Sequence, residues 1–440
     1  MTLASTTVWE IRAAGSINGG GGYNSARAGA VHDYSQQDNP QASIIADLLG
    51  AGSTSKLYTI ETAPFTAEMV GNIIHIRSTG GFTEGYYEIF SFEAADEVTL
   101  DRSPGNGTNG TGYVGGAGTF GWTSDYTNSL LGSVVAGNTV YVKGGNHTLV
   151  GNISAGNGTA VLPIKIIGYA VNRGDNPTGG TRPVIVGGVN NFTFGNYWWI
   201  QYLSLSTTAQ YGLKVGTNSH VMYCHSDNTS VSANYYAFYG AGSTSFIHCS
   251  GSCTLGVAIG LVTTDNRVLF CTLGGTLSDK GILSAGTSQA GNVIIGNIIK
   301  NCTTYGVQFA STSGWLVLNN VIYACGTGLY GTTMSGVSIL NNIISGCTTA
   351  ANWTTGTPEN LWDYNYYYNS STTTNITKGS NDVVGVITDL MFVDAPGGDF
   401  RLLPGSPCLN TGLATIGSGF MSKGAWQQKQ RSKQGGLLCY

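Results

Sequence analysis

The sequence has little charge and no long apolar run. Only 10% of its 440 residues are Asp, Glu, Lys or Arg, against roughly 25% in ordinary soluble domains. Long amphipathic helices need charged side chains on their exposed faces, so this composition argues against a helical protein. No window approaches the roughly 18 apolar residues of a transmembrane helix, and we expect no membrane insertion. The formal net charge of −4 offers no basic footprint, so we expect no nucleic-acid partner.

A secretion signal and a disulfide framework are also missing. The opening, MTLASTTVWEIRAAG, has no charged segment followed by an apolar run, so it does not read as a signal peptide. Nine cysteines are an odd number in a long chain, which argues against a disulfide scaffold. We therefore expect synthesis in a reducing cytoplasm and buried free thiols. We expect no cofactor and no metal, because a site made of His225 and His248 without a carboxylate would be unusual.

Glycine is abundant, and a repeat of 22 to 26 residues runs through the second half of the chain. The 66 glycines, with many Asn, Ser and Thr, are typical of short strands joined by turns. LNNVIYAC (318–325) and LNNIISGC (340–347) are two copies of the repeat. The aligned copies place in one column Cys224, Cys249, Cys271, Asn297, Asn320, Asn342 and Asn365. A second column contains Cys302, Cys325 and Cys347. Because β-branched residues alternate with Gly, Ser and Asn, the repeat predicts a parallel β-helix with one coil per unit.

Stacking of equivalent residues gives these columns a physical meaning. Successive coils lie about 4.8 Å apart, so equivalent side chains touch. An Asn amide can accept a hydrogen bond from one coil and donate to the next, which forms a ladder. Asn also tolerates the left-handed backbone of a coil corner, while Cys and aliphatic columns fill the interior. We predict a structural ladder in which Cys gives way to Asn along the axis.

The repeat divides the chain into three predicted parts. We place the β-helix at residues 125–395. Residues 1–124 lack its register and are predicted to be a β-rich region for capping or attachment. Within them, QASIIADLLG (41–50) reads as a short helix or a cap. Residues 396–440 are predicted to be a C-terminal cap and tail.

Three segments resemble a known superfamily. They are NTVYVKGG…LPIKIIGY (138–169), the NNxI…C repeats and the ending DFRLLPGSPCLNTG…SKGAWQ (399–427). They resemble the right-handed parallel β-helix proteins of the pectate-lyase-like superfamily, which includes polysaccharide lyases, glycoside hydrolases and phage tail spikes. The resemblance implies an all-β, right-handed parallel β-helix solenoid, and Asn410 stands where the closing segment usually has Asp. The opening TVWEIRAAGSINGGGGYN is similar to the start of phage structural proteins. The fold hosts many activities, so function stays open.

Acids are too sparse in the repeats for a catalytic pair. Glycoside hydrolysis uses two carboxyl groups roughly 5 to 9.5 Å apart. Between residues 176 and 358 the acids are Asp227, Asp265 and Asp279. A shift of each by one local repeat lands on Ser252, Thr287 and Tyr305, none of them an acid. We therefore expect no catalytic residue in the coils.

Aromatic residues form three dense clusters, at residues 196–202, 234–239 and 361–369. Alternate members of a strand point outward, where Tyr and Trp stack on sugars or form protein contacts. The other half of each cluster belongs to the core. The candidate contact residues are Trp198, Trp199, Tyr235, Tyr236, Tyr239, Tyr366 and Tyr368.

Three functions fit this sequence. We favour a non-enzymatic structural protein on the surface of a phage virion, such as a decoration protein, fibre or tail spike, made in the host cytoplasm. Its partners would be other virion proteins, copies of itself, for example in a homotrimer, and host surface polysaccharide. The alternatives are a polysaccharide lyase or glycoside hydrolase of the same fold, and a carbohydrate-binding adhesin.

Overall fold

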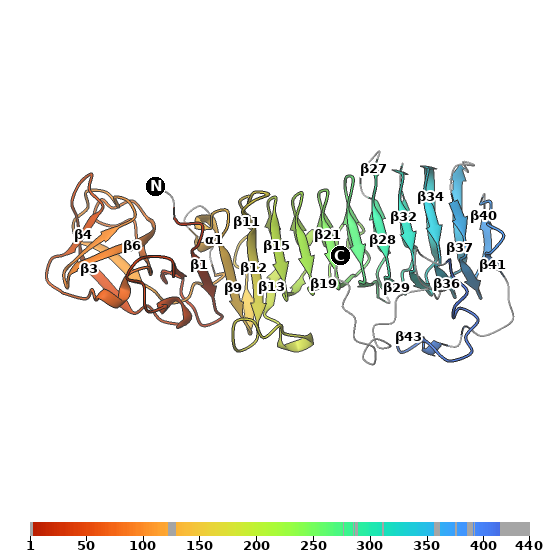
Figure 1. Cartoon of the computed structure of the whole chain (residues 1–440), viewed down its shortest axis with the longest axis horizontal. Helices are drawn as coiled ribbons and strands as arrows, with labels where there is room; N and C mark the ends of the chain where they lie inside the picture. Colours follow the sequence, from red (N-terminus) through yellow and green to blue (C-terminus); the bar gives the residue numbers. More distant parts are fainter. Residues whose placement is uncertain are drawn as a thin grey trace. The chain divides into compact units, whose positions relative to one another are not determined.

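The predicted all-β fold, a right-handed parallel β-helix, is confirmed. The structure is a computed structural model that describes residues 3–121, 129–275, 277–284, 286, 289–309, 312–355, 361–374, 376–384, 390 and 392–413. The chain divides into two compact units, Met1–Ser226 and Asp227–Tyr440, whose strands are labelled in Figure 1. The expected boundary at 124 and 125 falls within residues 122–128, outside the described residues, and stays a prediction.

The first unit contains a small closed barrel of antiparallel strands in the order β3-β4-β7-β6-β5-β8. The strands are β3 (Ala42–Gly50), β4 (Lys56–Thr59), β5 (Ile73–Ile76), β6 (Gly85–Ala94), β7 (Glu97–Leu100) and β8 (Gly110–Val114). The alternative of a short helix at 41–50 is wrong, because β3 covers these residues. Ile44 and Leu48 both lie in the barrel core, as residues four apart on a strand do, and the same spacing also fits a helix. A bulge between them, with Ala46 at φ 51°, leaves Ala46 exposed.

Three sheets make the coils of the first unit, and all their strands pair in parallel except β2, which is antiparallel to β1. Its first sheet contains β2 (Gly22–Tyr23), β1 (Val8–Ile11), β9 (Thr139–Lys143), β12 (Ile164–Tyr169), β15 (Trp198–Gln201) and β18 (His220–Met222). Its second sheet contains β10 (Asn146–Thr148), β13 (Val184–Gly188) and β16 (Ser204–Thr207), and its third contains β11 (Ile153–Ala155), β14 (Phe192–Phe194) and β17 (Tyr211–Val215). Strand β19 (His225–Asn228) spans the boundary between the units. Although β1 lies in the predicted capping region, it pairs in parallel with β9 and belongs to the coils.

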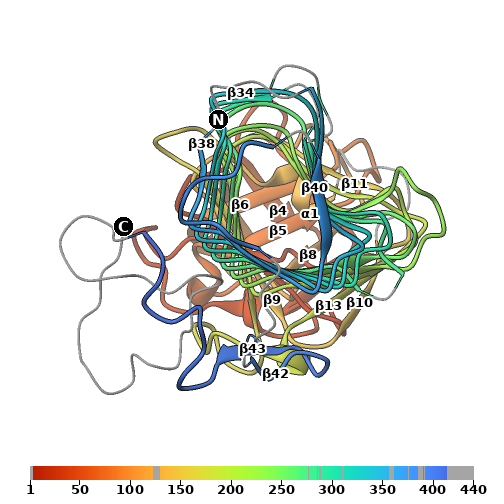
Figure 2. The same ribbon diagram turned by 90° about the vertical axis from the view of Figure 1, so that its right-hand side faces the viewer.

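The second unit repeats the same three-sided coil, and Figure 2 shows its strands lying over one another in successive coils. Its first sheet contains β21 (Ser245–Ile247), β24 (Arg267–Leu269), β28 (Val293–Ile295), β32 (Leu316–Leu318), β35 (Ser338–Leu340) and β38 (Leu361–Asp363). The second contains β22 (Ser250–Cys253), β25 (Thr272–Leu273), β29 (Ile298–Lys300), β33 (Val321–Tyr323), β36 (Ile343–Ser345), β39 (Tyr366–Tyr368) and β41 (Val383–Val384). The third contains β20 (Tyr236–Gly240), β23 (Val257–Leu261), β26 (Lys280–Ser284), β30 (Tyr305–Phe309), β34 (Thr327–Ser335), β37 (Thr349–Thr355), β40 (Ser371–Thr374) and the short β27 (Gln289–Ala290) and β31 (Thr312–Ser313).

A C-terminal hairpin covers the outer face of the second sheet in the second unit. Its strands are β42 (Phe392–Asp394) and β43 (Asp399–Leu402). Leu390 and Phe400 pack with the outward residues Val321, Ile343 and Tyr366 in one apolar cluster. The part of the predicted 396–440 cap that contains β43 therefore lies on the outer face of the second sheet. Residues 414–440 lie outside the described residues.

Helices are few and short in the described part of the chain. They are η1 (Tyr34–Gln36), η2 (Ala67–Met69), α1 (Leu130–Ser133) and η4 (Gly179–Thr181). None of the described helices has the length and apolar character that crossing a membrane requires.

Candidate functional site

The predicted Asn column lies in the second unit as a hydrogen-bonded ladder. The backbone N–H of Cys271 donates to Asn297 Oδ1 at 2.8 Å, that of Asn297 to Asn320 Oδ1 at 2.9 Å, and that of Asn320 to Asn342 Oδ1 at 3.0 Å. The side-chain amides of Asn297, Asn320 and Asn342 donate to backbone carbonyl oxygens as well. These Asn side chains are fully buried, so the ladder holds coils together and offers no ligand site.

The ladder ends on a carboxylate. Asn342 donates its N–H to Asn365 Oδ1 at 3.0 Å, and Asn365 donates its own N–H to Asp382 Oδ1 at 2.7 Å. Asp382 therefore takes the place of the next Asn. Gly379 N–H also donates to Asp382 Oδ2 at 3.2 Å, so both carboxylate oxygens have structural partners.

The predicted Cys residues are buried and reduced in both units. Cys302, Cys325 and Cys347 stack in one column of the second unit, where hydrogen bonds between neighbouring thiols and burial raise the pKa of Cys325 and of Cys347. Cys224 is buried in the first unit, and Cys249 and Cys271 are buried in the second. A thiol held in its protonated form is a poor nucleophile and a poor metal ligand, so Cys325 and Cys347 have a core-filling role.

Three of the seven candidate contact aromatics are not on the surface. Trp198, Tyr236 and Tyr366 are 0%, 9% and 2% exposed, so the expectation that they contact a partner is corrected. Trp198 points into the coil and donates its indole N–H to Gly156 O at 2.7 Å, while Tyr366 lies under the C-terminal hairpin. The half-exposed members are Trp199, Tyr235, Tyr239 and Tyr368.

Trp199 lies in a mixed basic and aromatic row on the outer face of the first sheet in the first unit. Parallel pairing places Thr139, Lys165, Trp199 and His220 in successive coils. Lys165 Nζ lies 5.3 Å from the Trp199 ring centroid, and the His220 ring packs edge-on with its centroid 5.8 Å away. All four side chains are half-exposed, so the row is open to solvent.

Aromatic side chains also stack at coil corners with strained backbones. Tyr202 and Tyr223 in the first unit stack at 5.2 Å between centroids, with φ of 57° and 55°. His248 and Phe270 in the second unit stack at 5.3 Å, with φ of 52° and 56°. Bulky residues rarely adopt this left-handed conformation. The stacking within each pair offsets part of its cost.

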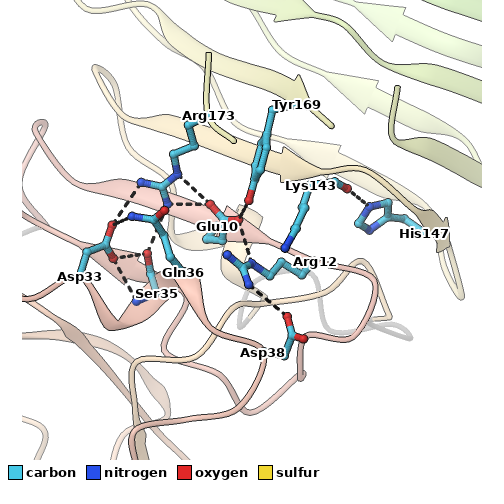
Figure 3. Close-up of polar contacts among 10 residues, drawn as sticks. All are labelled: Glu10, Arg12, Asp33, Ser35, Gln36, Asp38, Lys143, His147, Tyr169 and Arg173. Atoms are coloured by element: carbon cyan, nitrogen blue, oxygen red, sulfur yellow. Dashed lines mark hydrogen bonds and ion pairs between the residues drawn. The ribbon is translucent and has the colours of Figure 1, made fainter. Parts of the chain in front are cut away.

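A buried ionic cluster lies on the first coils of the first unit, and Figure 3 shows its members. Glu10 of β1 is 0% exposed. It accepts hydrogen bonds from Arg173 Nε at 2.9 Å, Arg173 Nη2 at 2.6 Å and Arg12 Nε at 3.0 Å. The Tyr169 hydroxyl donates to it too, and burial and this carboxylate raise the pKa of Tyr169. Both oxygens of Glu10 are therefore occupied by donors from its own chain.

The cluster extends to the segment around η1. Arg173 Nη1 lies 3.2 Å from Asp33 Oδ2, and Arg12 Nη1 lies 3.3 Å from Asp38 Oδ1. Asp33 accepts from the Ser35 N–H at 3.0 Å, which caps η1. These contacts fasten residues 33–38 and the loop after β12 to β1. Because no solvent reaches Glu10, the geometry suits anchoring and not chemistry on a polysaccharide.

The sequence gives only a partial signal for this cluster. Glu10 and Arg12 are two residues apart, so a strand places them on one face, and their ion pair could be inferred. Arg173 and Tyr169 are about 160 residues away in the chain, and no local pattern connects them to Glu10. Lys143 and His147 lie beside the cluster in Figure 3. His147 bonds the Lys143 carbonyl at 2.7 Å, and burial lowers the pKa of His147.

The carboxylates of Asp227 and Asp279 in the coils have structural partners. Asp227 Oδ1 accepts from Ser252 Oγ at 2.7 Å, which is the residue one repeat further along. Asp279 forms an ion pair with Lys280, and its backbone carbonyl accepts from the Tyr305 N–H at 3.2 Å. Thr287, the repeat equivalent of Asp265, lies outside the described residues.

One pair of carboxyl groups lies close together near the end of the second unit. Burial raises the pKa of Asp382, and the charge of Asp363 adds to the shift. Asp363 accepts from Asn381 N and Nδ2, both at 2.8 Å. Both residues lie after residue 358, beyond the repeats in which acids are sparse. The last coil is also short, since Asp382 follows Asn365 by 17 residues in place of the usual 22 to 26.

Metal-binding groups are scattered over the described ranges. Within those ranges, no three His, Cys, Asp or Glu side chains are grouped so that they could hold a metal ion.

Comparison with sequences connects part of the chain to one family. A family model described as NosD, a periplasmic copper-binding protein, matches residues 205–384. This stretch is less than half of the chain, so membership does not follow. No curated protein sequence matches the chain.

Comparison with solved structures defines the class of fold. The pectate lyase Pel9A has a TM-score of 0.50 and 14% identity, over 68% of this chain and 89% of that chain. A rhamnogalacturonan lyase has a TM-score of 0.44 and 11% identity, over 59% and 84%. The Dettilon tailspike protein has a TM-score of 0.29 and 10% identity, over 53% and 62%. The last two scores are too low for any argument. The chain therefore has a parallel β-helix fold like that of the pectate lyase.

Proposed function

We propose that this chain is a rigid, non-catalytic β-helix that binds an acidic polysaccharide on the outer face of its first unit. The observation that carries the proposal is the solvent-open row of Lys165, Trp199 and His220. An indole ring packs against the apolar face of a sugar. The long Lys165 side chain can turn from the ring to a sugar carboxylate, and His220 adds a hydrogen-bonding edge.

The backbone under this row supports binding without rearrangement. Trp199 lies in β15, which pairs with β12 on one side and β18 on the other. Side chains on a strand paired at both edges are held at fixed spacing, so little ordering entropy is lost on binding. Gln201 and the Tyr202–Tyr223 stack lie at the other end of the same strands and extend the polar and aromatic surface.

The state of the carboxylates supports a non-catalytic role. A glycosidase needs two carboxyl groups that reach the bond to be broken. Glu10 is buried between two arginines, and Asp227 and Asp279 are engaged by neighbouring side chains. None of these three offers a group poised for proton transfer to a sugar.

Binding of the full-length protein to polygalacturonate tests the proposal. We expect Trp199→Ala to weaken binding about tenfold or more. Stacking of a ligand ring as large as a nucleobase on one aromatic side chain contributes about 1–3 kcal/mol. Tyr211→Ala is the matched control, because Lys214 Nζ lies 4.9 Å from the Tyr211 ring centroid on the third sheet of the same unit. Equal affinities of the wild type and Trp199→Ala would overturn the binding surface. Release of reducing ends or unsaturated sugars would overturn the non-catalytic role.

A second candidate function, polysaccharide cleavage, rests on Asp363 and Asp382. Burial raises the pKa of Asp382, and a second carboxyl group, that of Asp363, lies beside it; glycosidases use two carboxyl groups as acid and base. If product appears, Asp382→Asn should abolish it while Asp227→Asn leaves it unchanged. Product formation that survives Asp382→Asn would exclude this pair.

We further propose that this chain is located on the surface of a phage virion. The similarity of the opening segment TVWEIRAAGSINGGGGYN to phage structural proteins and the low charge of the chain support it. Partners would then be other virion proteins and host surface polysaccharide, after synthesis in the host cytoplasm. Mass spectrometry of purified particles should detect the chain in a fixed ratio to the major capsid protein. Its absence from intact particles would refute a virion role.

A further inference from the structure

We propose that the binding surface around Trp199 continues to the neighbouring coil corner, where Arg182 binds a second carboxylate of the same polyuronate chain. This extension rests on the proposed polysaccharide binding. It adds the direction in which the sugar chain lies and the sugars whose carboxylates are bound. All the contributing residues belong to the first unit.

The register of the second sheet places Arg182 in a column with two tyrosines. Val184 of β13 pairs with Ser204 of β16. Arg182 and Tyr202 each stand two residues before these partners, so they lie at the same corner in successive coils. Tyr223 stacks on Tyr202 from the following coil. The corner therefore carries a cation followed by two aromatic rings.

This corner column repeats the order of the row on the first sheet. In that row Lys165 precedes Trp199, and His220 follows in the next coil. Lys165 and Arg182 belong to one coil, and Trp199 and Tyr202 belong to the coil after it. The face thus has a cation and an aromatic ring at each of its two ends.

Neither cation forms an ion pair with a carboxylate in the described part of the chain. By contrast, Arg173, in the same loop as Arg182, pairs with Glu10 and Asp33. The Arg182 Nε is shielded from solvent and has no hydrogen-bond partner among the described residues. Because a carboxylate that bonds a guanidinium side-on engages two of its nitrogens, a bound uronate would provide the partner that the chain does not.

The charge of Arg182 reaches the aromatic stack, which is open to solvent. Burial raises the pKa of Tyr202, and the positive charge of Arg182 opposes this shift. Arg182 and Tyr202 are half-exposed, and Tyr223 is 39% exposed. A sugar whose carboxylate bonds Arg182 can therefore pack its ring against the Tyr202 side chain.

The spacing of the two cations selects the sugars. Trp199 and Tyr202 are three residues apart, which corresponds to about 10 Å along a strand, and Lys165 and Arg182 mark the same two ends one coil earlier. A pyranose ring built from bonds of about 1.5 Å is about 5 Å long. The two ends are therefore about two sugar units apart, so the first and third sugars of a polyuronate place their carboxylates at the two cations.

This spacing lays the polysaccharide along the strands, across the coil axis. Between the two ends the face presents Ile167 and Gln201, which are adjacent in the pairing of β12 with β15 and are half-exposed. Both are uncharged, so the carboxylate of the middle sugar meets no cation there.

Titration calorimetry of the full-length chain with galacturonate oligomers of one to four sugars tests the spacing. We expect the largest gain in affinity, about tenfold or more, between the dimer and the trimer, as one hydrogen-bonded charge pair provides. Arg182→Gln should remove this gain. Arg267→Gln, which removes the same charge from an exposed position of the second unit, should retain it. A gain that is already complete at the dimer, or that persists in Arg182→Gln, overturns the proposal.

Methyl esters on single sugars of the trimer identify the carboxylates that are bound. An ester on the first or the third sugar should weaken binding about tenfold, whereas an ester on the middle sugar should have little effect. In Arg182→Gln, one of the two end esters should cause no further loss, because it removes the same contact. A middle ester that weakens binding as much as the end esters would contradict contact with alternate sugars.

Trp199→Ala separates a failure of the second charge contact from a failure of the whole binding surface. This substitution should weaken the binding of every oligomer, the dimer included. If the wild type and Trp199→Ala bind all oligomers equally, the surface is wrong and the role of Arg182 falls with it. If Trp199→Ala weakens binding but Arg182→Gln does not, the surface stands and the contact with Arg182 is refuted. Circular dichroism of each variant verifies that the β-helix is intact.

Discussion

At the scale of single residues, the backbone conformation of the coil corners limits which residue types can occupy them. The corner before the Asn ladder has a left-handed backbone at Phe270, Gly296, Asn319 and Asn341. Gly and Asn adopt this conformation at low cost, whereas Phe does not. Phe270 is accommodated because its ring lies over Gly296, where a Cβ would come within 2.6 Å of Phe270 Cδ1.

Two glycine substitutions separate backbone strain from this ring contact. Gly314→Ala, at φ 61° with no atom closer than 3.9 Å to the new Cβ, should cost about 1–2 kcal/mol of unfolding free energy from backbone strain alone. Gly296→Ala, at φ 69°, should cost at least about 1 kcal/mol more, because the Phe270 ring must move. Urea denaturation measures both. The extra cost should disappear in a Phe270→Ala background, and its persistence there would show that the ring is not the cause.

The buried ladder allows a second test at this scale. Asn320→Ala removes the acceptor of the Asn297 N–H and the donor to Ile294 O. Each buried polar group left without a partner costs about 1–3 kcal/mol, so we expect a loss of about 3 kcal/mol or more. Chemical denaturation measures the loss, and Thr272→Ala, at an exposed position, should change stability by less than about 0.5 kcal/mol. A similar effect of both changes would mean that the ladder contributes little.

At the scale of elements, the ionic cluster joins pieces of the first unit that are distant in sequence. β1, η1 and the loop after β12 meet at Glu10 and Arg173. Arg173 also lies with its guanidinium 4.7 Å from the Tyr141 ring centroid. A buried carboxylate is tolerated only with such partners, so the loss of one partner is costly.

Arg173→Met tests this anchoring. We expect a loss of about 3 kcal/mol in unfolding free energy, because Glu10 stays buried with fewer donors. Limited proteolysis should then cut within residues 33–38 faster than in the wild type. Arg401→Met, which removes the exposed ion pair with Asp399, should change neither quantity appreciably. Unchanged proteolysis in Arg173→Met would show that other contacts hold the segment.

The sequence repeat predicts some of these elements and fails to predict others. The columns of Asn and Cys predicted the β-helix, because identical rungs leave a period in the sequence. The period does not extend to β3, where the four-residue spacing of Ile44 and Leu48 fits a helix as well as a strand, or to β1, which joins the coils from the far N-terminus. It also fails at Tyr366, an outward residue that becomes buried under the hairpin. Long-range contacts decide these cases, and a short sequence window does not contain them.

At the scale of the whole molecule, all the described thiols are buried in both units. They are Cys224, Cys249, Cys253, Cys271, Cys302, Cys325, Cys347 and Cys408. Burial raises the pKa of Cys253 to about 12. In Cys439→Ser we therefore expect no fast reaction with a thiol reagent such as Ellman's reagent in the native protein. All eight thiols should react in guanidinium chloride, and any native thiol reacting within seconds would reveal an opened coil.

The ladder of the second unit has a direction, because every backbone N–H in it points to the amide oxygen of the following coil and the last points to Asp382. If the unit is shortened from its C-terminal side, the coil that becomes terminal has a ladder N–H without an acceptor, unless a new acceptor is introduced there. Shortening from the other side leaves only an amide oxygen without its donor, which is the milder defect. Natural length variants of such a protein should therefore gain and lose coils ahead of a conserved terminal carboxylate.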